Sequence, residues 1–195
     1  YYLYLEPTEM NEEAMNALQI GAHITNTGSG NTVFNGLHET TSYKGTTVLD
    51  SDVEIKQIVP FALDNDVIAG SPVATYMQST LVSLTNWEVK EVKTWATNES
   101  TVAILTLTKG GIDVDVAISK YFIFADDSNK EVKLANDTTV VPAVKAVYDE
   151  LQAGDFVSVK GILSNYNGKP QIIAHLADSL TKGTADNTPA AELPG

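Results

Sequence analysis

Residues 151–172 read LQAGDFVSVKGILSNYNGKPQI, and this stretch decides the fold. From Val157 to Gly161 apolar and polar residues alternate, which is typical of a β-strand with one buried face. Further on, the aromatic Tyr166 precedes Asn167-Gly168, and an Asn-Gly pair between two strand-like runs is the strongest short signal for a hairpin turn. The stretch therefore predicts two antiparallel strands joined by a tight turn.

The same pattern occurs once more, near the start of the chain. Residues 18–39 read LQIGAHITNTGSGNTVFNGLHE and share the Leu-Gln-x-Gly start, the next glycine at the same distance, and an aromatic residue before Asn-Gly. An apolar segment and a helical pattern precede each copy, at residues 2–5 and 7–18 in the first and 121–124 and 141–151 in the second. An internal repeat of this kind predicts two related modules.

Only the second copy has further strands in front of it. Residues 81–95 predict a long strand whose apolar phase changes, which requires a bulge near Thr85-Asn86. Residues 102–107 and 112–116 predict a hairpin that turns at Lys109-Gly110-Gly111. Three meandering strands, a helix and two strands are the order of the OB-fold. We therefore expect an all-β chain with a minor helix, in which a partial second copy precedes an OB-fold-like five-stranded Greek-key barrel.

These patterns divide the chain into four parts. Residues 1–50 are expected to form the C-terminal half of an OB-like module, 51–80 a connector, 81–182 the complete barrel and 183–195 a flexible tail. An incomplete first module exposes strand edges, which predicts a protein partner or self-association through this module. The alternative is that a strand within residues 53–58 closes it. Since the first residue, Tyr1, is neither Met nor part of a signal peptide, we expect a processed or larger protein.

Residues 151–172 resemble the last two strands of OB-fold modules in secreted bacterial nucleases and cell-surface lipoproteins. The resemblance covers residues 81–181 and, in part, residues 1–50, where Leu37-His38-Glu39 replaces Lys169-Pro170-Gln171. In that family the modules often occur in tandem beside a catalytic domain elsewhere in the chain. The resemblance implies a bacterial protein that is extracellular or at the cell surface.

Composition argues against several classes of function. All 12 basic residues are Lys and the net charge is −13, whereas phosphate recognition relies on Arg and on neutralising phosphate charge. Nucleic acid is therefore an unexpected partner. The chain has no Cys, which excludes disulfides and a thiol nucleophile, and no apolar run of about 18 residues, so we expect no membrane span.

No catalytic, metal or cofactor site is expected from the motifs. His23, His38 and His175 lack the spacing of a zinc site, which predicts structural or exposed roles for them. The acidic residues 126–131 lack the Gly and Glu that an EF-hand loop requires, and no Gly-x-Ser-x-Gly is present.

Aromatic residues supply the candidate ligand contacts. Trp87 fits the phase of the core, whereas Trp95 lies at a strand end and Tyr166 with Asn167 in the last hairpin. Trp95, Tyr166 and Asn167 are therefore predicted to contact a base or a sugar on the usual OB binding face. The alternative for the two aromatics is packing over the end of the barrel.

Three functions remain open, because a fold does not determine a function. The first is a non-catalytic binding or spacer module of a larger exported bacterial protein. The second is a structural subunit of a surface layer or filament, completed by a neighbouring chain. The third is OB-fold binding of single-stranded nucleic acid or sugar.

Overall fold

The computed structural model describes residues 2–4, 21–27, 30–34, 36–41, 46–50, 52–63, 77–93, 101–119, 142–174 and 178–185. Helix α4 spans Pro142–Asp149. The strands are β1 (Tyr2–Tyr4), β2 (Ile24–Thr27), β3 (Gly30–Phe34), β4 (Leu37–Thr41), β5 (Thr46–Leu49), β6 (Phe61–Ala62), β7 (Leu81–Val92), β8 (Thr101–Lys109), β9 (Ile112–Ser119), β10 (Phe156–Tyr166), β11 (Lys169–Ile173) and β12 (Leu180–Lys182). The helix expected at 7–18, the strand at 121–124, the acidic residues 126–131, Trp95 and His175 lie outside the described residues.

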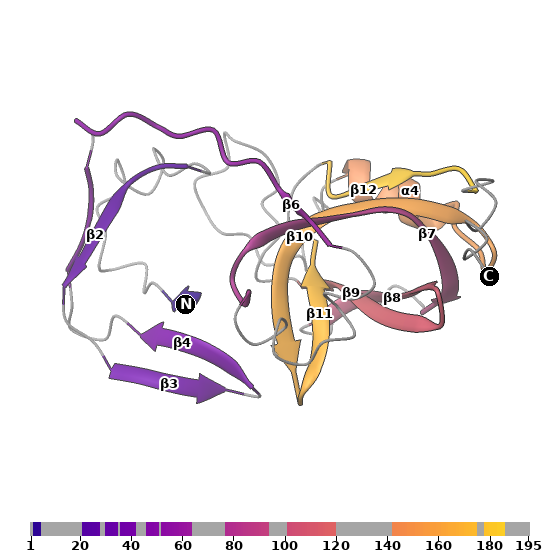
Figure 1. Cartoon of the computed structure of the whole chain (residues 1–195), viewed down its shortest axis with the longest axis horizontal. Helices are drawn as coiled ribbons and strands as arrows, with labels where there is room; N and C mark the ends of the chain where they lie inside the picture. The colour runs from indigo at the N-terminus through magenta and orange to yellow at the C-terminus, as the bar shows by residue number, and fades with distance from the viewer. Residues whose placement is uncertain are drawn as a thin grey trace, which may run out of the picture.

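Five strands close into a barrel (Figure 1). Strands β7, β8 and β9 form an antiparallel meander, and β9 pairs in parallel with β11. Strand β11 pairs antiparallel with β10, which returns to β7 and completes the ring. Helix α4 lies between β9 and β10, the third and fourth barrel strands in chain order. This is the OB-fold order, and the predicted all-β class is confirmed.

A bulge bends β7 at the predicted place. The register with β10 shifts between Val157, which pairs with Trp87, and Val159, which pairs with Leu84. Thr85 and Asn86 of β7 therefore lie opposite a single residue of β10, which is the extra residue of a bulge. Asn86 has a φ of 54°, a left-handed conformation that Asn tolerates better than most residues. Because of the bulge, Leu84 and Trp87 both point into the core although they lie three residues apart.

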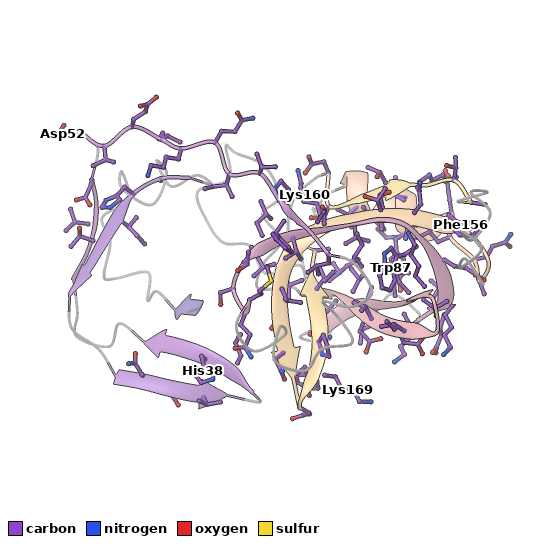
Figure 2. All side chains as sticks on the ribbon, in the orientation of Figure 1. His38, Asp52, Trp87, Phe156, Lys160 and Lys169 are labelled. Atoms are coloured by element: carbon purple, nitrogen blue, oxygen red, sulfur yellow. The ribbon has the colours of Figure 1, made fainter. Side chains whose placement is uncertain are left out.

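The core fills the barrel, and α4 covers one end of it. Trp87 is 1% exposed and lies inside the ring of strands (Figure 2). Val144 and Tyr148 reach into the same core from the helix. The Tyr148 hydroxyl group donates to the carbonyl oxygen of Lys93 and lies 3.1 Å from that of Ile104. The helix is thus held by both apolar packing and hydrogen bonding.

The connector before β7 contributes to the barrel. Strand β6 pairs in parallel with β7, and Leu63 is buried in the core. Thr80 accepts a hydrogen bond from the Leu163 amide at 2.9 Å. The strand within residues 53–58, the alternative for closing the first module, is not formed. Residues 54–60 have no ladder partner, and Val53 and Ile58 are exposed, so the segment lacks the sheet face that would stabilise a strand.

The first module repeats the pairing of the barrel's second half. Strand β4 pairs in parallel with β1 and antiparallel with β3, as β11 pairs with β9 and β10. Strands β2 and β5 pair as β10 and β12 do. Equivalent glycines have equivalent conformations, with φ of 92° at Gly21 and 93° at Gly154, and 89° at Gly36 and 81° at Gly168. The two segments therefore share strand pairing and register, and the partial second copy remains a prediction.

A buried amide joins the two modules. Gln78 Nε2 donates to the carbonyl oxygen of Gly36 at 2.9 Å, and Gln78 Oε1 accepts from the His38 amide at 3.1 Å. Gly36 also lies against Asn165, because a Cβ atom at position 36 would be 2.6 Å from the Asn165 Oδ1 atom. The turn of the β3–β4 hairpin therefore meets the end of the β10–β11 hairpin (Figure 1).

Candidate binding face of the barrel

Strands β8 and β9 present a polar outer face. Leu107 and Val114 point into the core, and side chains alternate along a strand, so the residues between the buried ones point outward. Directly paired residues share one face of a sheet, which places Thr108 beside Asp113 and Thr106 beside Asp115. Two carboxylates and two hydroxyl groups thus lie together on the outside of the barrel.

The two carboxylates have different partners. Lys90 Nζ donates to Asp113 Oδ2, and Thr106 Oγ1 donates to Asp115 Oδ1 at 2.8 Å. Hydrogen bonds from Lys90 and then Thr108 hold the pKa of Asp113 below its usual value of 3.8. Asp113 is therefore ionised at neutral pH and paired with a cation, whereas the partner of Asp115 is a neutral hydroxyl group.

An amide and an aromatic ring extend this face across β11. Gln171 pairs with Asp115, so the two side chains share the outer face. Tyr166 pairs with Lys169 at the end of the hairpin, and Tyr166 is 54% exposed. Carboxylate, hydroxyl and amide groups can exchange hydrogen bonds with a ligand, and an exposed ring can stack on it. We refer to Thr106, Asp113, Asp115, Gln171 and Tyr166 as the polar face.

The predicted ligand residues have distinct places. Tyr166 ends β10, and Asn167 and Gly168 form the turn with φ of 52° and 81°. Two positive φ values are those of the hairpin turn expected for Asn-Gly. Trp87 is a core residue, as expected, while Trp95 lies outside the described residues. The ligand roles of Trp95, Tyr166 and Asn167 remain predictions.

The described histidines belong to the first module. His23 Nδ1 lies 2.5 Å from Asp50 Oδ2, and Thr25 Oγ1 donates to the same oxygen at 2.8 Å. These bonds, first that of Thr25 and then that of His23, lower the pKa of Asp50. Among the described residues, no three His, Cys, Asp or Glu side chains gather as a metal site would require. Nor does any helix in those ranges have the length and apolar character to cross a membrane.

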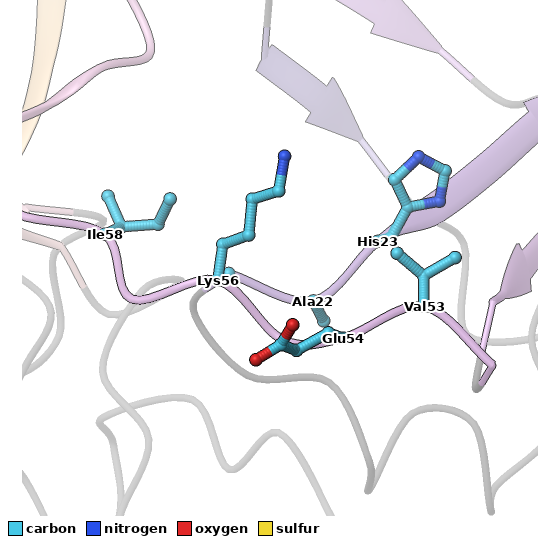
Figure 3. A pocket seen from close by; sticks show the side chains of 7 residues that line it. Ala22, His23, Val53, Glu54, Lys56 and Ile58 are labelled. Atoms are coloured by element: carbon cyan, nitrogen blue, oxygen red, sulfur yellow. The ribbon is translucent and has the colours of Figure 1, made fainter.

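A pocket of about 350 Å³ lies away from the polar face, where the connector runs along the start of β2 (Figure 3). Its charged groups, Glu54 and Lys56, are exposed on the connector. Its lining residues are Gly21, Ala22, His23, Val53, Glu54, Lys56 and Ile58. Much of the pocket wall belongs to the connector, which forms no strand pairs there, whereas the polar face lies on paired strands of the barrel. The polar face is therefore the stronger candidate for a binding site.

Sequence reasoning missed the central residues of the polar face. The sequence pattern predicts Asp113 and Asp115 only as members of a strand. Their signal was the alternation Ile-Asp-Val-Asp-Val at residues 112–116, which sets two carboxylates on one face of any strand. Gln171 gave no comparable signal, because its neighbour Asp115 comes from the parallel pairing of β9 and β11.

Comparison with known proteins gives no family. No family model matches the chain, and no curated protein matches its sequence. An OBody, AM1L10, bound to hen egg-white lysozyme superposes with a TM-score of 0.37 at 16% identity, over 55% of this chain and 81% of that one. The S. pombe Stn1–Ten1 complex gives a TM-score of 0.35 at 14% identity, over 52% of this chain and 57% of that one. The OB-fold assignment therefore rests on strand order and register.

Proposed function

We propose that the chain is a non-catalytic binding module of a larger exported bacterial protein, and that its polar face binds a neutral sugar chain. The observation that supports this ligand is the row of Asp113, Asp115 and Gln171 on an outer face of the sheet that the exposed Tyr166 shares by its strand phase. Sugars offer hydroxyl groups for hydrogen bonding and an apolar ring face for stacking. OB-folds bind oligosaccharides as well as oligonucleotides on this side of the barrel.

Electrostatics favours the sugar over a nucleic acid. The chain has a net charge of −13, and the polar face carries Asp113 and Asp115, with Lys90 bonded to Asp113 and Lys169 paired with Tyr166. A polyanion gains affinity mainly because Lys and Arg neutralise its phosphates and displace their condensed counterions into solution, whereas a chain with a large negative net charge repels it. A neutral ligand pays no such penalty.

Export and a bacterial source are supported by composition and by the resemblance of residues 151–172 to modules of secreted proteins. Basic charge supplied only by Lys, and the absence of Cys, are compatible with that assignment. A second candidate, a structural subunit of a surface layer or filament, is favoured by one observation. The sheet of the first module ends in uncharged edge strands, β1 and β3.

An array of neutral oligosaccharides, followed by calorimetric titration of the strongest binder, tests the proposal. Tyr166→Ala should weaken binding about 5-fold or more, since a stacked ring contributes about 1 kcal/mol. Asp115→Ala should also weaken it, whereas Asp52→Ala, in the exposed connector, should not. Submicromolar binding of an oligothymidylate at about 150 mM salt, or no binding of any neutral sugar, would overturn the proposal.

A further inference from the structure

The buried Gln78 side chain holds the β3–β4 hairpin beside the barrel. Gln78 is 8% exposed, and both polar atoms of its amide bond to main-chain groups of this hairpin, at Gly36 and His38. Moving the hairpin away would leave a buried amide without these partners, which is costly. The two bonds therefore favour one position of the hairpin relative to Gln78.

The two residues after Gln78 bond to strand β10, which ends in Tyr166. The Ser79 amide donates to the Leu163 carbonyl oxygen at 2.7 Å, and the Leu163 amide donates to the Thr80 carbonyl oxygen at 2.9 Å. Ser79 has a φ of 65°, a left-handed conformation that is uncommon for serine. Such a conformation persists where the contacts on both sides of it require it. The hairpin of the first module is thus fixed relative to β10.

In this position Gly36 lies against Asn165, whose side chain caps the turn of the β10–β11 hairpin. Asn165 Oδ1 accepts a hydrogen bond from the Gly168 amide at 2.8 Å. A Cβ atom at position 36 would lie 2.6 Å from this Oδ1 atom and 3.6 Å from the Gly168 nitrogen, so Gly36 is close to both ends of the bond. Gly36 therefore limits the space in which the Asn165 side chain could turn away from Gly168.

The matching hairpin of the first module cannot make this side-chain bond. Counted back from the Asn-Gly pair, Val33 takes the place of Asn165, and valine has no hydrogen-bond acceptor in its side chain. Gly36 and Gly168 nevertheless have similar φ, 89° and 81°, so the turn forms without the cap. The Asn165 cap is therefore an addition to the hairpin that carries Tyr166, rather than a requirement of the turn.

We propose that the first module positions the ligand-binding hairpin of the barrel, and that Gln78 and Asn165 are the positioning residues. Gln78 holds Gly36 against Asn165. Asn165 then holds the turn at Gly168, and this limits the directions that the adjacent Tyr166 ring can take. A ring that is already ordered loses less conformational entropy when a sugar stacks on it, so affinity rises without a further contact to the ligand. The inference rests on the sugar site proposed above and gives the first module a part in its affinity.

A double-mutant cycle on the full chain tests the positioning role. Calorimetric titration gives the Kd of the neutral oligosaccharide that wild type binds most strongly. Gln78→Ala and Asn165→Ala should each raise this Kd about 5-fold, the factor that corresponds to the loss of one hydrogen bond. Because Gln78 acts through Asn165, the double variant should also raise Kd about 5-fold, and not about 25-fold as independent effects would. Gln152→Ala is the matched control, because Gln152 is exposed on the barrel, and it should leave Kd unchanged.

Gln78→Glu covers the case in which Gln78→Ala does not fold. This variant keeps the size of the side chain and removes only the donor to the Gly36 carbonyl oxygen. Its Kd should rise by about the same 5-fold, since one hydrogen bond is lost. Circular dichroism and the urea midpoint of each variant show that the barrel itself is folded when Kd is measured.

Hydrogen exchange of the Gly168 amide, measured by NMR without ligand, separates this inference from the sugar proposal. Exchange should be about 5-fold faster in Gln78→Ala and Gln78→Glu than in wild type, because the Asn165 cap opens more often. If wild type binds no neutral sugar, the proposed function fails, and the exchange rates still decide whether the first module holds the hairpin. Equal exchange rates in wild type and both Gln78 variants overturn the positioning role. A Kd that neither variant changes, or effects that multiply in the double variant, overturn it equally.

Discussion

Replacing Tyr148 by Phe tests how α4 is held on the barrel. The Tyr148 side chain is buried near the end of the helix, and its hydroxyl group lies where β7 and β8 separate. There it donates to the carbonyl oxygen of Lys93, the residue after β7, while the Lys93 amide donates to the Ile104 carbonyl oxygen at 3.1 Å. The Phe variant keeps the ring and removes only the donor.

The expected cost follows from the acceptor that is left behind. Losing a hydrogen bond whose other partner stays in place costs about 1–2 kcal/mol. For a domain of about 100 residues this lowers the melting temperature by about 5–10 °C. Tyr148→Ala, which also empties the space of a buried ring, should cost about 3–5 kcal/mol.

Urea unfolding followed by tryptophan fluorescence measures these changes, because the buried Trp87 reports on the barrel. Tyr166→Phe is the matched control: it removes the same atom from a side chain that is 54% exposed, and should change stability by less than about 0.5 kcal/mol. If Tyr148→Phe unfolds at the wild-type urea concentration with the same slope, the hydroxyl does not hold the helix and the reasoning is refuted.

Four further outcomes are expected. Burial raises the pKa of Tyr148 from 10.0 to about 12. The neutral hydroxyl group therefore stabilises the folded state fully below pH 10, and this stabilisation is lost as the pH rises through about 12. Between these two pH values, the urea midpoint should fall more in wild type than in Tyr148→Phe. Lys90→Gln should raise the pKa of Asp113, measured by carboxyl NMR titration, because the main cause of its lowering is removed. Gly154→Ala should cost the barrel about 1–2 kcal/mol through its positive φ alone, measured by urea unfolding. At Gly21 an added Cβ would also lie 1.8 Å from a carbonyl oxygen of the connector, so Gly21→Ala should displace the connector and speed its proteolysis.

The features that the sequence predicted well are those set by local backbone chemistry. Asn167-Gly168 fixes a hairpin because both residues accept positive φ, and the phase change around Thr85-Asn86 requires a bulge wherever β7 pairs. The repeat then supplied the strand order without any knowledge of long-range contacts. These signals were sufficient for the OB-fold assignment.

The features it did not predict depend on contacts between distant segments. Nothing near Leu63 indicates that it enters the barrel core, and the β6 pairing comes from the adjacent edge of β7. Gln78 reads as an ordinary polar residue, yet it is 8% exposed and bonds to two residues of the first module. The polar face was missed for the same reason, because Asp115 and Gln171 meet only when the barrel closes.

Comparison of the two modules indicates that strand register and barrel stability depend on different interactions. The pair Asn26–Thr47 takes the place of Val159–Leu180, yet each module keeps the same register and the same bond just beyond it, from Asp50 to His23 at 3.0 Å and from Gly183 to Phe156 at 2.7 Å. Register therefore follows from turn geometry and main-chain bonding, which tolerate the change from apolar to polar pairs. Barrel stability does depend on the change from apolar to polar pairs, because polar side chains gain little free energy when they leave water. The first module thus keeps the register of the barrel's second half with a polar pair, Asn26–Thr47, at the position of an apolar one.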